Sequence, residues 1–324
     1  MPFFCTTASA SYLFIIVALL IPVGCQNTTS SQKQEAASQE PQLTVTTNIL
    51  ADGVQRLLDE DAQVQALMGP GVDPHLYKAS QRDLSMLSEA RIVVYNGLHL
   101  EGKMADVLER YGQRKPTVAV AELVEESRLL APENYSGAHD PHIWMDVALW
   151  RDALMAAADA LKPHLPHQAD ALQQRQQALA DSLTALDEWV RKKMARIPQE
   201  QRVLITAHDA FSYFGRAYDI EVRGLQGIAT TSEFGLHDVT HTVDFIIDRD
   251  IPALFVETSV SPRAIEAVVE GCRKKGHEVI IGGKLYSDAL GAAGTPEGTY
   301  SGMIRHNVNT IFKALMPQHA IRTP

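Results

Sequence analysis

Short apolar runs alternate with amphipathic segments along most of the chain. Seven runs rich in aliphatic and β-branched residues are predicted to be strands: residues 43–49, 64–68, 91–96, 117–120, 202–206, 253–257 and 278–282. Segments with apolar residues at helical spacing lie between them and are predicted to be helices: 51–58, 80–90, 236–249 and 262–275. Because strands that alternate with helices form βαβ units, we expect an α/β fold with mostly parallel sheets.

One segment, residues 166–197, instead carries a single long helical pattern. Its apolar residues recur at spacings of three, four or seven and form one stripe: Leu172, Leu179, Leu183, Leu186, Val190, Met194 and Ile197. Pro166 suits the first turn, and Pro198 ends the helix. The stripe could pair with a second copy in a coiled coil, but its place between two α/β halves favours a strut that joins two lobes.

The N-terminus has the pattern of an export signal. Residues 11–23 form an apolar run that is too short to span a bilayer, and Gly24-Cys25 follows it. A small residue before a cysteine resembles a lipobox, in which the cysteine is lipidated and becomes the mature N-terminus. Pro22 stands where lipoboxes usually carry leucine, and no basic residue precedes the run. An ordinary cleaved signal is therefore the alternative.

These patterns predict the organisation of the chain. Residues 26–41 are polar and rich in Ser, Thr and Gln, which predicts a flexible tether. We expect a signal peptide (1–24), a tether (25–41), an N-terminal lobe (42–165), a linking helix (166–197) and a C-terminal lobe (198–324). The protein is expected in the periplasm or at the cell-envelope surface, held to a membrane only by a lipid on Cys25.

Composition excludes several classes of protein. Of 324 residues, 45% are hydrophobic and 21% charged, which indicates a globular chain. The net charge of −10 argues against binding to nucleic acid. Three cysteines are too few for a disulfide framework, and Cys272 is expected to be a buried thiol. Twelve histidines are the unusual feature that remains.

Four residues suggest a metal site because they follow strand-like runs or lie in turn sequence: His75, His142, His208 and Asp288. His75 and His142 each end an Asp-Pro-His tripeptide. Imidazole and carboxylate suit Zn²⁺, Mn²⁺ or Fe²⁺, whereas a Cu(I) or Fe–S site would need thiolates. A lone histidine is more often a surface or hydrogen-bonded residue, but three at such positions favour a shared site.

The other histidines give weaker signals. His139 lies near the second Asp-Pro-His tripeptide and could face solvent. His237 and His241 have the i, i+4 spacing of a metal pair but lack the glutamate of an H-E-x-x-H zinc protease. The rest lie in helices or polar segments, and most are expected at the surface: His99, His164, His167, His277, His306 and His319.

Several motifs, in order along the chain, resemble those of one family: G-V-D-P-H-L-Y, V-V-Y-N-G-L-H-L-E, D-P-H-I-W-M-D, T-A-H-D-A-F-S-Y-F, F-V-E-T-S, L-Y-S-D-A-L and G-T-P-E-G-T-Y-S-G-M. From about residue 43 onward the sequence resembles the metal-specific solute-binding proteins of zinc and manganese ABC transporters, the helical-backbone metal receptors (cluster A-I, or cluster 9). The resemblance implies two lobes joined by one long helix, with a metal ion in the cleft between them. It implies His75 and His142 as ligands from the first lobe, and His208 and Asp288 from the second. It also implies delivery of the ion to a permease that is driven by a separate ATPase.

The resemblance leaves the identity of the ion open. Family members with glutamate at the third ligand are usually manganese receptors, and here that position is His208. Zinc receptors often carry a long loop rich in histidine and acidic residues, whereas residues 130–142 are short and contain only His139 besides the ligand. We therefore expect capture of Zn²⁺, Mn²⁺ or both, with Fe²⁺ also suited to the ligands.

Two other functions and one supporting residue complete the expectations. A surface adhesin is one alternative, because lipid-anchored members of this family have been described as adhesins. A metal-dependent hydrolase is the other, but four protein ligands leave little room for an activated water. We expect a monomeric binding protein and not an enzyme. Glu257, at a strand end, is expected to orient a ligand histidine, with an ordinary salt bridge as the alternative.

Overall fold

The computed structural model describes residues 42–58, 62–132, 138–231 and 235–316, together with Met1. The predicted signal peptide, Cys25, almost all of the tether and His319 lie outside the described residues. The expected export signal and lipid anchor therefore stay predictions, as do the boundaries of the lobes. Within the described ranges, no helix combines the length and the apolar character that crossing a bilayer would require.

The N-terminal lobe is built on a parallel four-stranded sheet in the order β2-β1-β3-β4. Its strands are β1 (Gln42–Thr47), β2 (Gln63–Met68), β3 (Ile92–Tyr95) and β4 (Thr117–Ala119). Its helices are α1 (Asn48–Leu58), α2 (Gln81–Glu89), α3 (Ala105–Gly112) and α4 (Val147–Leu161). The central strand β1 is almost wholly buried, as its run of apolar and threonine side chains requires between two covered faces.

The C-terminal lobe repeats the parallel pattern. It contains the strands β5 (Val203–His208), β6 (Glu221–Gln226), β7 (Ala253–Glu257) and β8 (Ile280–Leu285). Strand β5 pairs with β6 and β7 pairs with β8, and β5 packs beside β7. The helices of this lobe are α6 (Ser212–Tyr218), α7 (Leu236–Arg249), α8 (Arg263–Lys274) and α9 (Tyr300–Leu315). The expected two-lobe α/β class is confirmed.

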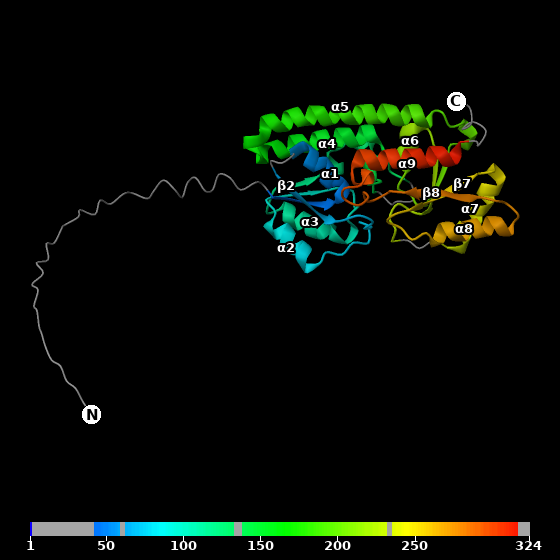
Figure 1. Ribbon diagram of the computed structural model, residues 1–324, viewed down its shortest axis with the longest axis horizontal. Helices are drawn as coiled ribbons and strands as arrows, with labels where there is room; N and C mark the ends of the chain where they lie inside the picture. Colours follow the sequence, from blue (N-terminus) through cyan, green and yellow to red (C-terminus); the bar gives the residue numbers. More distant parts are fainter. Residues whose placement is uncertain (2–41, 59–61, 133–137, 232–234, 317–324) are drawn as a thin grey trace, which may run out of the picture. The chain divides into compact units, whose positions relative to one another are not determined.

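The long helix α5 (Ala169–Met194) has 26 residues and follows a 3₁₀ turn at Pro166–Gln168. Figure 1 shows it as one straight rod along the side of the molecule that also carries α4 and α9. The predicted leucine-rich stripe is buried against α1, α4 and α9 of the same chain. Because the chain itself covers this stripe, α5 is a strut and its apolar face is not free for a coiled coil.

Three clusters of buried apolar side chains hold the fold together. The largest runs along α5 and contains residues of both lobes, from Leu43 in β1 to Leu315 in α9. A second cluster belongs to the C-terminal lobe and includes the free, buried Cys272, which confirms the expected buried thiol. A third belongs to the N-terminal lobe, around Met68 and Leu87. The two lobes therefore share one core and each has a second core of its own.

The strand predicted at 278–282 is misplaced, since β8 begins at Ile280 and continues to Leu285. Gly282 and Gly283 look like turn residues in sequence, but both belong to the strand. A Cβ at Gly282 would lie 2.6 Å from Ala314 Cβ, and one at Gly283 would lie 2.4 Å from Thr310 Cγ2. The glycines are thus needed because α9 packs directly on this strand. Strand β6 and helices α3, α4, α6 and α9 were not predicted at all.

Candidate metal centre

The four candidate ligands are carried by four separate segments and meet at one point. His75 lies in the loop after β2, His142 immediately before the 3₁₀ turn Ile143–Met145, His208 at the end of β5, and Asp288 in the loop after β8. All four residues are at most 2% exposed. One donor atom from each lies within 4.8 Å of the others. In the described part of the chain, no other group of three or more His, Cys, Asp or Glu side chains is gathered in this way.

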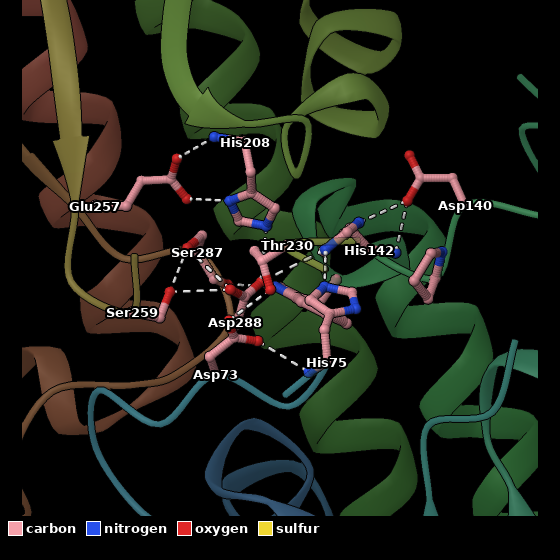
Figure 2. Close-up of polar contacts among 12 residues, drawn as sticks. Asp73, His75, Asp140, His142, His208, Thr230, Glu257, Ser259, Ser287 and Asp288 are labelled. Carbon is pink, nitrogen blue, oxygen red and sulfur yellow. Dashed lines mark hydrogen bonds and ion pairs between the residues drawn. The ribbon is translucent and has the colours of Figure 1, made fainter. Parts of the chain in front are cut away.

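The donor atoms face one another closely (Figure 2). Nε2 of His75 is 3.2 Å from Nε2 of His142. Oδ1 of Asp288 is 3.5 Å from Nε2 of His142 and 3.4 Å from Nε2 of His208. The other carboxylate oxygen, Oδ2, accepts a hydrogen bond of 2.9 Å from Ser259 Oγ. The serine holds the carboxylate from one side, so that Oδ1 is left for the centre.

Two buried carboxylates hold the rings of His142 and His208 from behind. Oδ1 of Asp140 accepts from the backbone N–H of His142 at 2.9 Å and lies 2.7 Å from its Nδ1. Oε1 of Glu257 accepts from the backbone N–H of His208 at 2.9 Å, and Oε2 lies 2.6 Å from its Nδ1. In both residues Nδ1 is occupied, so Nε2 is the nitrogen that faces the other candidate ligands.

The repeated Asp-Pro-His tripeptide has a structural cause. Oδ1 of Asp73 accepts from the backbone N–H of His75 at 2.9 Å, as Oδ1 of Asp140 does from His142. This turn, in which an aspartate accepts from the N–H two residues later, fixes the backbone on which each histidine stands. The second carboxylate oxygen of Asp73 accepts a hydrogen bond of 2.6 Å from Thr230, in the loop after β6. The loops of the two lobes are thereby tied together beside the centre.

The electrostatics differ among the three imidazoles. Burial, together with the nearby His142 ring, lowers the pKa of His75 to about 3. Burial also acts to lower the pKa of His142, but the charge and hydrogen bond of Asp140, with a contribution from Asp288, raise it to about 9. For His208, Glu257 and Asp288 outweigh burial and raise the pKa well above its usual value. Despite its burial, Asp288 has a pKa far below its usual range because His208 and His142 face it.

Sequence reasoning identified Glu257 but missed other residues that contact the group, among them Ser259 and two residues near His142. The first is Asp140, although its tripeptide was noticed. The second is Trp144, which is 2% exposed, lies edge-on to His142 and donates from Nε1 to the carbonyl oxygen of Ser287 at 2.8 Å. The W in D-P-H-I-W-M-D was the only available signal for this residue. The expected surface residue His139 does not join the group, since its Nε2 lies 3.5 Å from Glu126 instead.

Comparison with known proteins decides the family. The family model for the periplasmic component A of the zinc-uptake complex, ZnuA, matches residues 43–314. The chain belongs to the ZnuA family. Family membership confirms the resemblance seen in the sequence motifs, and it identifies the family as a component of a metal-uptake complex.

Individual ZnuA-family relatives agree over nearly their full length. The manganese-binding lipoprotein MntA of Bacillus subtilis (strain 168) is 48% identical over 306 residues, which is 94% of this chain and 98% of MntA. The zinc-binding protein TroA of Treponema pallidum (strain Nichols) is 44% identical over 283 residues, which is 87% of this chain and 91% of TroA. The solved structure of TroA superimposes with a TM-score of 0.84 and covers 86% of this chain and 100% of the TroA chain.

Proposed function

We propose that this protein captures a divalent transition-metal ion outside the cytoplasm and delivers it to a membrane permease that is driven by a separate ATPase. The cargo is Zn²⁺, Mn²⁺ or both. The buried group of three imidazoles and one carboxylate carries this proposal, because their donor atoms already lie within 4.8 Å of one another. Three nitrogen ligands and one oxygen ligand suit the tetrahedral coordination of zinc and are also accepted by manganese and iron.

The relatives support both ions. MntA is named as a manganese-binding lipoprotein and TroA as a zinc-binding protein, and this chain is similar to each. The general order of affinity places Zn²⁺ above Fe²⁺ and Mn²⁺ at a site of nitrogen and oxygen ligands. We therefore propose that the isolated protein binds Zn²⁺ most tightly, and that supply and the permease select the ion that is carried in the cell.

Binding, and not catalysis, follows from the same geometry. A hydrolytic metal site keeps an open position for water and has a general base nearby. Here four protein donors converge, and two nearby carboxylates, Asp140 and Glu257, are already engaged with ligand rings. The family is itself a component of an uptake complex, which supports capture of an ion over the adhesin and hydrolase alternatives.

Export and anchoring complete the proposal. We propose that Cys25 is lipidated after removal of the signal, since MntA, of similar sequence, is named as a lipoprotein. We further propose that the protein acts as a monomer, because α5 buries its apolar stripe within its own chain. As a test of the lipid anchor, Cys25→Ala should shift the protein from the membrane fraction to the soluble fraction when both are prepared from the organism that makes it. Retention of the variant in the membrane fraction would show that another feature anchors the protein.

Calorimetric titration of the metal-stripped protein with Zn²⁺, Mn²⁺ and Fe²⁺ tests the main proposal. We expect one tightly bound ion per chain, with Zn²⁺ the tightest of the three. Elemental analysis after gel filtration gives the stoichiometry independently. Absence of any tight binding would overturn the proposal, as would tight binding that survives removal of the candidate ligands.

The affinity for metal is expected to depend on pH over a wider range than at a site whose histidines keep their usual pKa. Because the pKa of His142 is raised to about 9, this ring holds a proton at neutral pH that the ion must displace. The apparent affinity should therefore fall as the pH drops below about 9, by roughly tenfold per pH unit for each proton displaced. His75, with a pKa of about 3, adds no dependence near neutral pH.

Titration near neutral pH in two buffers of different ionisation enthalpy counts the released protons. We expect at least one proton per bound ion. A proton count of zero at neutral pH, with an affinity that falls only below the ordinary histidine pKa of 6.5, would contradict the raised pKa of His142.

Glu257→Gln is expected to weaken binding of Zn²⁺ by about 10- to 100-fold, the usual cost of losing a carboxylate behind a metal-binding histidine. Glutamine keeps the shape of the side chain and one oxygen for the His208 backbone N–H. It removes the charge that lies 2.6 Å from His208 Nδ1. Glu221→Gln in the exposed start of β6 is the matched control and should leave the affinity unchanged. If Glu257→Gln bound Zn²⁺ as tightly as the wild type, the ion pair between Glu257 and His208 would have only a structural role.

A further inference from the structure

Two histidines outside the metal centre stand one turn apart on helix α7. His237 and His241 are both exposed, and the side chain of His237 is 91% accessible. Their ring centroids are 6.3 Å apart and the ring planes differ by only 11°. Residues four positions apart project from the same face of a helix, so the two rings stand side by side above the helix surface.

The opposite face of α7 does the packing. Val243 and Ile246 are buried in the core of the C-terminal lobe, which turns the histidine face towards solvent. Within the described residues, neither ring makes a hydrogen bond to a protein group. Oδ1 of Asp238 lies 3.8 Å from His237 Nδ1. Turning either imidazole about its side-chain torsions towards a common ion therefore breaks no hydrogen bond to the described part of the protein.

Asp238 also makes the start of this helix acceptable for a cation. The positive end of a helix dipole disfavours a bound cation in the first turn. Oδ2 of Asp238 accepts from the backbone N–H of Gly235 at 2.8 Å, which places a carboxylate at this end of the helix and beside His237. The local charge that an ion would meet is thus lowered by a side chain already held in place.

We propose that His237 and His241 form a second, exposed site for a divalent transition-metal ion, with two imidazole ligands and water in the remaining positions. Imidazole nitrogens bind Zn²⁺ at about 2.0–2.1 Å, so the two donor atoms need to approach to roughly 3–4 Å, which rotation of parallel rings allows. The affinity order is Cu²⁺ above Zn²⁺ above Mn²⁺. The site is weaker than the buried centre because it has fewer protein ligands. It does not depend on the proposed function of that centre.

The position of the pair relates it to the buried centre. Thr230, which contacts Asp73 beside the centre, lies seven residues before His237. Seven residues span at most about 25 Å even when fully extended, so His237 lies within roughly that distance of Thr230. A second ion bound here would share no ligand with the first.

Equilibrium dialysis of the full chain, loaded beforehand with one equivalent of Zn²⁺, tests the proposal with Zn²⁺ itself as the probe. We expect a second, weaker ion on the wild-type protein. His237→Ala and His241→Ala should each weaken that second event at least tenfold, and the affinity for the first ion should stay unchanged in both. The double variant His164→Ala/His167→Ala removes two exposed histidines that are not spaced as a helical i, i+4 pair and serves as the control.

The possible outcomes separate clearly. Loss of the second ion in both single variants but not in the control supports the site. Three results would overturn it: no second ion on the wild-type protein, a second ion that persists unchanged in His237→Ala/His241→Ala, or an equal loss in the control. Because the substituted side chains are exposed, we expect the circular dichroism spectrum and the unfolding midpoint to match those of the wild type.

Discussion

Replacing His142 by alanine is expected to weaken binding of Zn²⁺ by roughly 100- to 1,000-fold. Binding at a structural zinc site with four ligands is worth about 10–16 kcal/mol, so one ligand accounts for about 2.5–4 kcal/mol on average. His142 is at the centre of the group, since its Nε2 is 3.2 Å from His75 Nε2 and 3.5 Å from Asp288 Oδ1. Its loss also leaves the buried Asp140 carboxylate without the ring that it contacts.

Competition with a chelator of known affinity measures this change better than direct titration, because the wild-type affinity is expected to be high. His164→Ala, at an exposed position before α5, is the control and should bind as the wild type does. Asp288→Asn keeps the shape of the fourth candidate ligand but removes its charge, and it should also weaken binding strongly. If His142→Ala bound Zn²⁺ as tightly as the control, the proposed ligand set would be wrong.

The second large effect concerns stability. Trp144→Ala should lower the free energy of unfolding by about 3–5 kcal/mol, the usual cost of truncating a buried tryptophan. Trp144 is 2% exposed, and its indole N–H donates to Ser287 of the other lobe at 2.8 Å. The hydroxyl of Tyr300 donates to the backbone carbonyl oxygen of Trp144 at 2.7 Å. The substitution leaves a cavity behind His142 and removes a link between the lobes next to Asp288.

Urea unfolding of the metal-free protein measures this loss. Trp189→Ala is the matched control, because Trp189 lies half-buried on α5 and makes cation–π contacts with Lys193 and Arg305. Those contacts contribute about 0.5–1 kcal/mol each at exposed positions, so we expect a smaller loss. Saturating Zn²⁺ should restore part of the stability of Trp144→Ala, since an ion that binds only the folded protein stabilises it. Equal losses of unfolding free energy in the two variants would show that Trp144 contributes no more to stability than the half-buried Trp189.

Much of the fold could be predicted from the sequence because its strands are short apolar runs and α5 has a clear stripe. The prediction failed where tertiary contacts override the local pattern. Strand β6 (E-V-R-G-L-Q) is charged and contains glycine, and β8 runs through two glycines that α9 requires. Helix α4 was missed for another reason, since its buried residues, such as Trp150, Leu154 and Leu161, do recur at helical spacing.

The candidate ligands were found because each histidine follows a strand or a rigid turn, a signal that is local in sequence. The residues that hold them could not be found in the same way. Trp144 meets Ser287 at a sequence separation of 143 residues, and Thr230 meets Asp73 at a separation of 157. Such partners are set by the way the two lobes close on each other, which no local pattern records. Glu257 was an exception because it also ends a strand.

The core that runs along α5 has a consequence for engineering. Because residues of both lobes interleave in that one cluster, neither half of the chain is a self-contained module. In a chimera that exchanges a whole lobe with a relative, the apolar side chains that the two lobes place in this shared core would come from different proteins and would pack poorly. Transplanting only the loops that carry His75, His142, His208 and Asp288 leaves the interior intact. Metal preference is therefore better reprogrammed from the loops than by recombining halves.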